Sequence, residues 1–285
     1  MLRATFQPYV SDYVNYVCEL LQSVVGNDRL VIVGPIEGEI PSKALLVGIN
    51  FEHTLVSPGG RHSDGAPLGI VRVIDSPETK YTVRIANRYY LSECDIVIDY
   101  SIPNCFHVRS SRKFPEIAKR QVYIAPCLYP IAWNRTGRTI DILTTFLDTS
   151  QPRRKALLES AGSLCTNVSS CFEGSELCRL YQSAKILINI HQTPHHHTLE
   201  ELRVLPAIQN GVIVLAEKSP LFDLVPYHDC IVWVTYETAL DVAKTILAEY
   251  DDTWSRLFTP KMRGILESLH ESNRDSLRLH IHSNV

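Results

Sequence analysis

The stretch "KILINIHQTPHHHTLEELRVLPAIQNGVIVLAE" (residues 185–217) places one helical pattern between two apolar runs. "KILINI" (185–190) and "GVIVLA" (211–216) have the length and the continuous apolar character of strands that are buried on both faces. "TLEELRVLPAIQN" (198–210) has a helical pattern, although Pro206 should kink that helix or start a new one. Strand, helix and strand in this order predict a parallel α/β sheet.

The same alternation continues through the second half of the chain. The apolar, β-branched pattern predicts further strands at 139–147 and 229–234. Helices are predicted at 151–162, 174–184 and 237–250, and the first of them has Pro152 in its first turn and Gly162 at its end.

The first half is also α/β but less regular. Its predicted strands are 29–34, 44–50, 69–75, 81–85, 94–101 and 121–126. The strands 69–75 and 81–85 are too close for a helical crossover, so we expect a hairpin. Helices are predicted at 11–24 and 103–120, the latter interrupted by Pro115.

"PCLYPIAWNRTGRT" (126–139) has no periodicity and is predicted to be a linker. We therefore expect two Rossmann-like domains that meet near it, with a ligand in the cleft between them. The expected limits are 1–130, 131–250 and a helical C-terminal segment at 251–285.

Composition limits the class of protein. The 285 residues are 45% hydrophobic and carry a net charge of −3 without a long basic block, which argues against nucleic acid as a partner. No apolar run is long enough for a membrane span, and the N-terminus does not resemble a signal peptide. The eight scattered cysteines favour free thiols in a reducing compartment, and hence the cytoplasm, over a disulfide set.

Polar residues follow the predicted strands of the second half, where ligands of open parallel sheets bind. Arg153 and Arg154 lie in the first turns of the helix after strand 139–147, where a cation is unfavourable unless an anion binds. Guanidinium groups suit phosphate oxygens, although a solvated surface pair is the alternative. Asp148, Thr149 and Ser150 can cap this helix.

The loop "HQTPHHHT" follows strand 185–190. Three consecutive histidines do not readily converge on one ion, so a metal site is disfavoured, but His191 and His196 can donate to pyrophosphate or sugar hydroxyls. Thr198 and Glu201 fit a capping box. Alternatively, Glu201 or the neighbouring Glu200 accepts the ribose hydroxyls.

Several nucleotide and hydrolase signatures are missing. The sequence has no G-x-G-x-x-G after a strand and no P-loop, which disfavours a nicotinamide cofactor and a P-loop NTPase. It has no G-x-S-x-G elbow, and no D-x-D where a metal-dependent transferase would need it.

"DILTTFLDTSQPRRKALLES", "LYQSAKILINIH" and "EELRVLPAIQNGVIVLAE" resemble the donor-binding half of the GT-B glycosyltransferases, and "GINFEHTLVSPGGR" is similar to an acceptor-side strand and loop. The chain also resembles small cytosolic glycosyltransferases of large algal viruses, which include β-xylosyltransferases. It departs from the GT-B pattern in two ways. Its first domain is short, and it lacks the E-x7-E motif, because the residue eight positions after Glu201 is Gln209 and not a glutamate.

The resemblance implies an acceptor-side domain at 1–130 and a donor-binding domain at 131–250. It also implies transfer of a hexose or pentose, with xylose as one candidate, from a UDP-sugar to a glycan or glycoprotein hydroxyl in the cytoplasm, the host's if the protein is viral. We expect inversion without a metal or other cofactor. The alternatives are a non-catalytic nucleotide- or carbohydrate-binding module and a His-cluster metallohydrolase. The expected donor-binding residues are Arg153, Arg154, Asn189, His191, His196, Thr198, Glu200, Glu201 and Arg203.

Inversion needs a base that takes the proton of the acceptor hydroxyl. We expect it in the first half, near strand ends. Asp75 is the first choice because a strand end holds a side chain rigidly, and His53 follows because of its ordinary pKa. Asp64 and Glu52 are further candidates, and each of the four can instead simply order a turn or loop.

Overall fold

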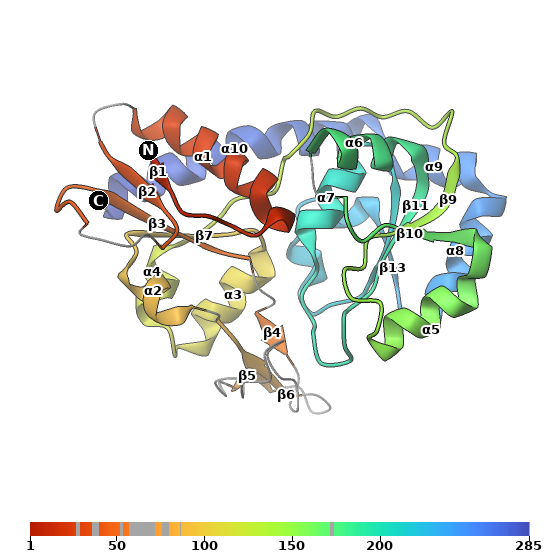
Figure 1. The fold of residues 1–285 in the computed structure, drawn as a ribbon, viewed down its shortest axis with the longest axis horizontal. Helices are drawn as coiled ribbons and strands as arrows, with labels where there is room; N and C mark the ends of the chain where they lie inside the picture. Colours follow the sequence, from red (N-terminus) through yellow and green to blue (C-terminus); the bar gives the residue numbers. More distant parts are fainter. Residues whose placement is uncertain are drawn as a thin grey trace. The chain divides into compact units, whose positions relative to one another are not determined.

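The computed structural model describes residues 1–26, 29–35, 40–51, 54–56, 72–75, 80–85, 87–171 and 174–284. The chain packs as two compact units. The first unit contains Met1–Pro126, His195–Thr198 and His270–Val285, and the second contains Cys127–Pro194 and Leu199–Leu269. Each unit has its own parallel sheet of five strands, which confirms the predicted α/β class and the two Rossmann-like domains (Figure 1).

The sheet of the first unit confirms four of the predicted strands and adds a short edge strand. Its order is β1 (Leu2–Arg3), β2 (Val31–Val33), β3 (Leu45–Asn50), β7 (Ile96–Asp99) and β8 (Gln121–Tyr123), all parallel. The strands β2 and β7 are buried along their whole length, because helices cover both faces of the sheet.

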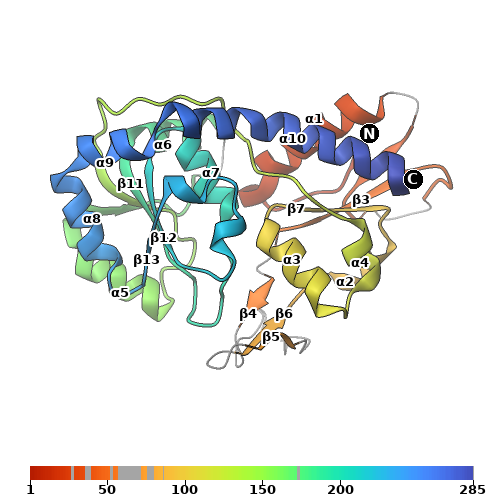
Figure 2. The same ribbon diagram turned by 180° about the vertical axis from the view of Figure 1, so that it is seen from behind.

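Helix α1 (Ser11–Val25) and the part of α10 (Pro260–Asn284) from His270 onward lie on one face of this sheet. Helices α2 (Arg88–Glu93), α3 (Ile102–Ser111) and α4 (Pro115–Arg120) lie on the other (Figures 1 and 2). On the first face, Tyr13 of α1 donates to the carbonyl of Ile124 at 2.8 Å. Asn273 of α10 exchanges two hydrogen bonds with the backbone of Ala125, each of 2.8 Å.

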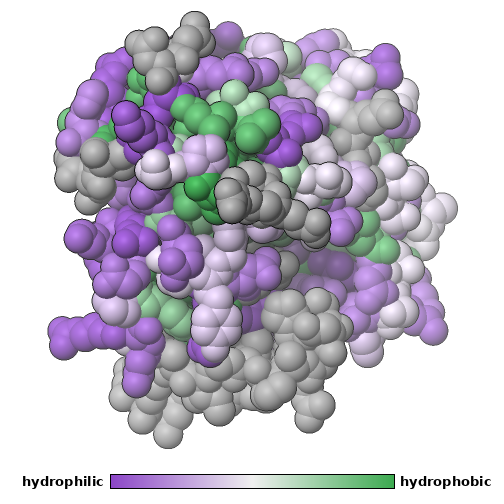
Figure 3. All heavy atoms as spheres, turned by 60° about the vertical axis from the view of Figure 1, so that its left-hand side comes forward, coloured by the Kyte–Doolittle hydropathy of each residue, from purple (hydrophilic) through white to green (hydrophobic). Residues whose placement is uncertain are grey.

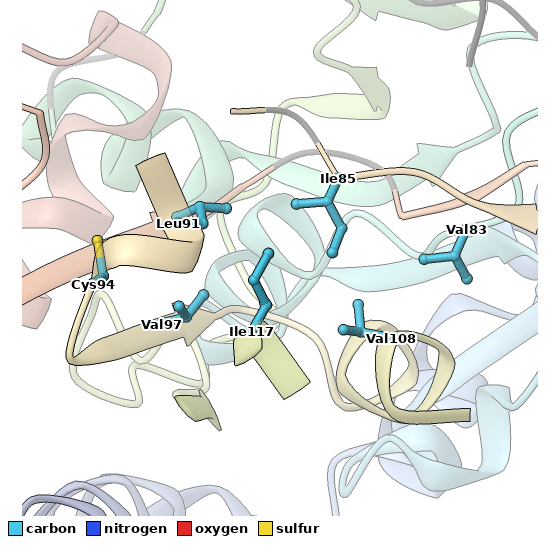
Figure 4. Close-up of a cluster of buried hydrophobic side chains, with 7 residues drawn as sticks. All are labelled: Val83, Ile85, Leu91, Cys94, Val97, Val108 and Ile117. Atoms are coloured by element: carbon cyan, nitrogen blue, oxygen red, sulfur yellow. The ribbon is translucent and has the colours of Figure 1, made fainter. Parts of the chain in front are cut away.

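On the opposite face an apolar cluster joins α2, α3 and α4 to β7 (Figure 4). Its buried members are Val83, Ile85, Leu91, Cys94, Val97, Val108 and Ile117. The predicted interruption at Pro115 is confirmed: α3 ends at Ser111, Arg112 adopts a left-handed φ of 56°, and α4 begins with Pro115.

A small antiparallel sheet accompanies the first unit. Its order is β4 (Leu55–Val56), β6 (Lys80–Val83) and β5 (Arg72–Asp75). The pairing of β5 with β6 confirms the predicted hairpin.

The sheet of the second unit confirms the predicted strands of that half. Its order is β10 (Cys165–Asn167), β9 (Ile140–Thr144), β11 (Ala184–Asn189), β12 (Ile213–Glu217) and β13 (Ile231–Val234), all parallel. Only the short edge strand β10 lacks a clear apolar run in the sequence. The helices of this unit are α5 (Pro152–Ala161), α6 (Gly174–Ser183), α7 (Glu201–Gln209), α8 (Ala239–Ala248), α9 (Tyr250–Leu257) and the first part of α10. Short 3₁₀ turns occupy Pro8–Val10, Gly162–Leu164, Phe222–Leu224 and His228–Cys230.

Three local predictions need correction. Of the two outcomes expected at Pro206, a kink or a new helix, the second does not occur, because α7 continues through Pro206 to Gln209. Glu201 is the first residue of α7, so it cannot be the third residue of a capping box that starts at Thr198. The N-cap of α5 is Gln151, which makes no side-chain capping bond.

A buried arginine holds together the ends of two helices in the second unit. Arg138 donates to the carbonyls of Tyr181 at 2.9 Å and of Asn210 at 2.6 Å, and also to that of Ala184. The residues Tyr181 and Asn210 lie at the carboxyl ends of α6 and α7, where carbonyls lack helical partners and a cation is favourable. Burial lowers the pKa of Arg138.

All eight cysteines are free, and three of them, Cys94, Cys171 and Cys230, are buried. The face drawn in Figure 3 is largely hydrophilic, with apolar residues in small patches. Among the described helices, none has the length and apolar character that crossing a membrane requires.

Candidate functional site

The carboxyl ends of β9, β11 and β12 bring polar side chains together in the second unit. Because β11 lies between β9 and β12 and all three are parallel, the segments that follow them meet at one edge of the sheet. Residues 145–151 follow β9 and lead into α5, His191 comes shortly after β11, and Glu217 is the last residue of β12. This is the edge at which open parallel sheets bind ligands.

Glu217 joins the start of α5 to the loop after β11. Its Oε1 accepts a hydrogen bond of 2.6 Å from Arg153, and its Oε2 accepts one of 2.9 Å from the backbone N–H of His191. The Nδ1 of His191 is 3.4 Å from the same Oε2. Burial by itself would raise the pKa of Glu217, but the hydrogen bonds and charge of His191 and the hydrogen bond from Arg153 lower it to about 2. Glu217 is therefore ionised at neutral pH and holds both groups.

Tyr236, which follows β13, fixes Arg153 from a second side. The guanidinium carbon of Arg153 lies 4.3 Å from the centroid of the tyrosine ring. The tyrosine hydroxyl donates to the backbone carbonyl of Arg153 at 2.9 Å. A stacked and ion-paired guanidinium has few rotamers to lose when it binds an anion.

Glu200 bridges two further arginines. Its Oε1 is 3.5 Å from Arg154, and its Oε2 accepts a hydrogen bond from Arg203. Arg154 is only 3% exposed and lies 4.6 Å over the ring of Phe146. Burial lowers the pKa of Arg154, and the charge of Glu200 opposes that shift. The arginine is thus a buried cation that forms an ion pair with Glu200, and this setting differs from the solvated surface pair that was the alternative to phosphate binding.

The turn before α5 is ordered by its own side chains. Asp148 accepts hydrogen bonds from the backbone and hydroxyl of Ser150, at 2.9 and 2.6 Å, and from the amide of Gln151 at 2.8 Å. These bonds lower the pKa of Asp148. Its role is to shape the loop that presents Arg153 and Arg154.

The remaining expected donor-binding residues divide between the two units. Asn189 is buried at the end of β11. Glu201 is fully buried and its Oε2 accepts a hydrogen bond of 2.7 Å from Tyr227, so its carboxylate lies inside the second unit. His196 and Thr198 are buried and belong to the first unit. The Oγ1 of Thr198 is 3.5 Å from Asn104 of α3.

Of the four candidate bases, three lie outside the described residues: Glu52, His53 and Asp64. Asp75 is the last residue of β5 and stands opposite Lys80 of β6 in the register of the hairpin. Its place at a strand end agrees with the sequence analysis.

Asp99, at the end of β7, is a buried carboxylate that the sequence analysis did not single out. Its Oδ1 accepts from the backbone N–H of Ser101 and from Asn104, each at 3.0 Å. Its Oδ2 accepts from Asn50 at 2.7 Å and from Gln121 at 2.8 Å. Burial raises the pKa of Asp99 to about 6, although these four bonds lower it.

Four donors occupy the lone pairs of Asp99, so this carboxylate is poorly placed to accept a further proton from a substrate. Its role is to tie β3, β8 and α3 together behind the strand ends. A signal existed in the sequence, since "CDIVIDYS" (94–101) places an aspartate at the end of a wholly apolar strand.

Over the part of the chain that the structure describes, no three histidine, cysteine, aspartate or glutamate residues are grouped so that they could hold a metal ion. The three arginines carry a charge of +3, and Glu217, Glu200 and Asp148 carry −3, so these groups sum to zero and the edge offers guanidinium donors in place of a net positive charge. This arrangement suits an anion with several oxygens.

The low pKa of Glu217 predicts a pH dependence of stability. A glutamate whose pKa falls from 4.5 to about 2 on folding stabilises the protein above pH 4.5 and loses that contribution as the pH falls through about 2. Between about pH 6 and pH 3 this loss should reach about 2 kcal/mol in wild-type protein and be absent in Glu217→Gln. Urea unfolding across this range measures it.

The control for this experiment is Glu159→Gln, which removes a carboxylate that is 67% exposed on α5. It should leave the slope of stability against pH almost unchanged. Equal slopes for Glu217→Gln and wild type would contradict the ion-paired geometry at this edge.

No protein-family model matches the chain. Uncharacterized protein R358 of Acanthamoeba polyphaga mimivirus is 26% identical over 166 residues, covering 57% of this chain and 56% of that protein. The match thus spans little more than half the length of that relative.

Two solved structures resemble the fold. T4 phage BGT, in complex with UDP and Mn2+, aligns with a TM-score of 0.54 at 11% identity, covering 99% of this chain and 97% of that one. TarM aligns with a TM-score of 0.50 at 12% identity, covering 94% of this chain and 58% of that one. The chain therefore has a two-domain, Rossmann-like fold of the GT-B type.

Proposed function

We propose that this protein is a glycosyltransferase that moves a sugar from a UDP-sugar to a hydroxyl of a glycan or glycoprotein. The observation that carries the proposal is the arginine cluster at the carboxyl edge of the second sheet in a GT-B fold. The choice of UDP is supported by BGT, which was solved with that nucleotide. Xylose is a candidate sugar, with hexoses as the alternative.

In this proposal the diphosphate of the donor binds at the edge that Arg153, Arg154 and Arg203 line. Negative charge grows on the diphosphate as the bond to the sugar breaks, and preorganised cations stabilise that charge. Glu217 and Glu200 hold the guanidinium groups in place before the donor arrives. The arginines then need little rearrangement during the reaction. Because they are already in place, they lower the activation free energy of the transfer step.

We further propose that transfer inverts the anomeric carbon and needs no metal. The acceptor hydroxyl attacks the sugar carbon as the bond to the diphosphate oxygen breaks, and a base of the first unit takes the hydroxyl proton. The candidate bases are Asp75, His53, Asp64 and Glu52, in that order. The arginines supply the positive charge that a metal would otherwise provide.

Arg153→Ala should raise the dissociation constant for UDP about ten-fold or more, because a charge-assisted contact contributes roughly 1.5–3 kcal/mol. Isothermal titration with UDP and with uridine measures the effect. Uridine lacks the diphosphate, so its affinity should change little. The matched control is Lys155→Ala, which removes a cation of the same helix that is 63% exposed and paired with Glu159.

Equal UDP affinity in wild type and Arg153→Ala would show that this arginine does not bind the diphosphate. Arg154→Ala serves as a second variant, but its burial requires a parallel measurement of stability. Arg154→Ala would support a direct contact with the diphosphate if it unfolds at the same urea concentration as wild type but binds UDP more weakly.

Product analysis tests the reaction itself. The protein is incubated with a panel of sugar nucleotides, including UDP-xylose and UDP-glucose, and a mixed set of acceptor glycans, with EDTA or with added Mn2+. Transfer with EDTA and an inverted anomeric centre is the expected result. Tight UDP binding without any transfer would favour a non-catalytic binding module, and thermal stabilisation by zinc alone would favour a metallohydrolase.

A further inference from the structure

Helices α3 and α4 of the first unit carry a concentration of positive charge. Residues 102–120 contain five lysines and arginines and one glutamate, a net charge of +4 in a chain whose total is −3. Four of these cations are exposed, and we refer to them as the basic face: Arg109, Arg112, Lys113 and Lys119. The fifth, Arg120, is half-buried and is paired with Glu116 at 3.5 Å.

The basic face differs from several other helices in how its cations are paired among the described residues. On helices α5, α8 and α10, several exposed basic side chains pair with an acid three or four residues away, as in Lys155–Glu159 and Lys244–Asp241, although Lys261 has no ion pair among the described residues. None of the four cations of the basic face pairs with a carboxylate of the described residues. Unpaired like charges repel one another, so binding of an anion to this face is electrostatically favourable.

Two large aromatic side chains are exposed on the same group of helices. Phe106 is 45% exposed, and because it lies three residues before Arg109, the two share the outward side of α3. Tyr89 of α2 is 75% exposed, and the Arg88 guanidinium lies 4.7 Å from its ring. Helix α4 packs against both α2 and α3, and all three helices lie on one face of the first sheet (Figures 1 and 2).

The helix dipole accounts for only part of this pattern. Arg109 and Arg112 lie at the carboxyl end of α3, and Lys119 lies in the last turn of α4, where cations are favourable. That effect explains single cations at helix ends. It does not explain why aromatic rings stay exposed on the same helices, because contact of each ring with water is unfavourable.

We infer that the basic face, together with Phe106 and Tyr89, binds the surface of an anionic lipid bilayer. Lysines and arginines are drawn to anionic headgroups, and aromatic side chains enter the boundary between headgroups and acyl chains. A lipid surface offers this face both anionic headgroups for its cations and an apolar layer for Phe106. The charged backbone of a nucleic acid would bind the cations but would offer the phenylalanine ring no apolar layer. This inference goes beyond the proposed transfer reaction and does not depend on it.

The test is co-sedimentation of the full chain with vesicles of phosphatidylcholine alone or with roughly one third phosphatidylserine. Wild type should sediment with the anionic vesicles, stay in solution with phosphatidylcholine alone, and be released as salt rises. The double variant Arg109→Ala with Lys113→Ala should bind roughly thirty-fold more weakly, because each cation near an anionic surface contributes about five-fold. Phe106→Ser, which leaves the charge unchanged, should bind the anionic vesicles about ten-fold more weakly.

The matched control is Lys155→Ala with Lys244→Ala, which removes two exposed cations from the second unit. It should bind vesicles as wild type does, and circular dichroism should give the same spectrum for every variant. Three results would overturn the inference: no sedimentation with anionic vesicles, an equal loss in the control, or binding of duplex DNA at physiological salt without binding of vesicles.

Discussion

Arg138→Ala should destabilise the second unit by at least about 4 kcal/mol, since each hydrogen bond from a charged donor contributes about 1.5–3 kcal/mol. The side chain is 8% exposed and donates to four backbone carbonyls, those of Asn134, Tyr181, Ala184 and Asn210. Alanine would leave these buried acceptors without a partner and would remove the cation from the carboxyl ends of α6 and α7. Urea unfolding followed by far-ultraviolet circular dichroism measures the loss.

Arg135→Ala is the matched control, three residues away in the same linker. That arginine is 46% exposed, and its contacts are to Ser255 at 3.3 Å and to Asp251 at 3.8 Å. An exposed pair of this kind contributes about 1 kcal/mol or less. Arg138→Lys should fall between wild type and alanine, because one ammonium cannot reach four divergent carbonyls. Equal unfolding midpoints for Arg138→Ala and Arg135→Ala would show that the buried bonds contribute little.

The second large effect concerns the proposed base of the first unit. Asp75→Asn should lower turnover roughly hundred-fold or more while the affinity for UDP stays close to that of wild type. The reason is that asparagine keeps the shape of the side chain but cannot take the acceptor proton. Initial rates at saturating donor, beside titration with UDP, separate the two quantities. Glu93→Gln, an exposed carboxylate of α2, is the control and should keep its rate.

Three further variants complete this experiment: His53→Ala, Asp64→Asn and Glu52→Gln. If Asp75→Asn is active and one of the others has lost its rate, the base is that residue. Near-normal turnover in all four would contradict an inverting mechanism with a base in this part of the chain. A loss of UDP binding together with rate would instead indicate damage to the fold.

The sequence was sufficient to predict the layers of the fold. Apolar runs such as 185–190 and 211–216 could be recognised as strands because a sheet covered on both faces needs apolar residues at every position. The break at Pro115 and the hairpin of β5 and β6 followed from local covalent geometry and from chain length. At Pro206 the sequence left two outcomes open, a kink or a new helix, and the structure excludes the second because α7 runs through the proline to Gln209.

For the candidate site, the sequence by itself determined which polar residues follow the strands, because parallel strands all end at the same edge of a sheet. Only the tertiary structure decided their partners. Arg153 meets Glu217 across 64 residues of sequence, and Glu200 rather than Glu201 faces the arginines. The strand order β9, β11, β12 creates these pairs, and burial then decides which carboxylate pairs with arginine and which packs inside the protein. Strand order and burial arise from contacts between distant segments, and no local pattern of residues encodes them.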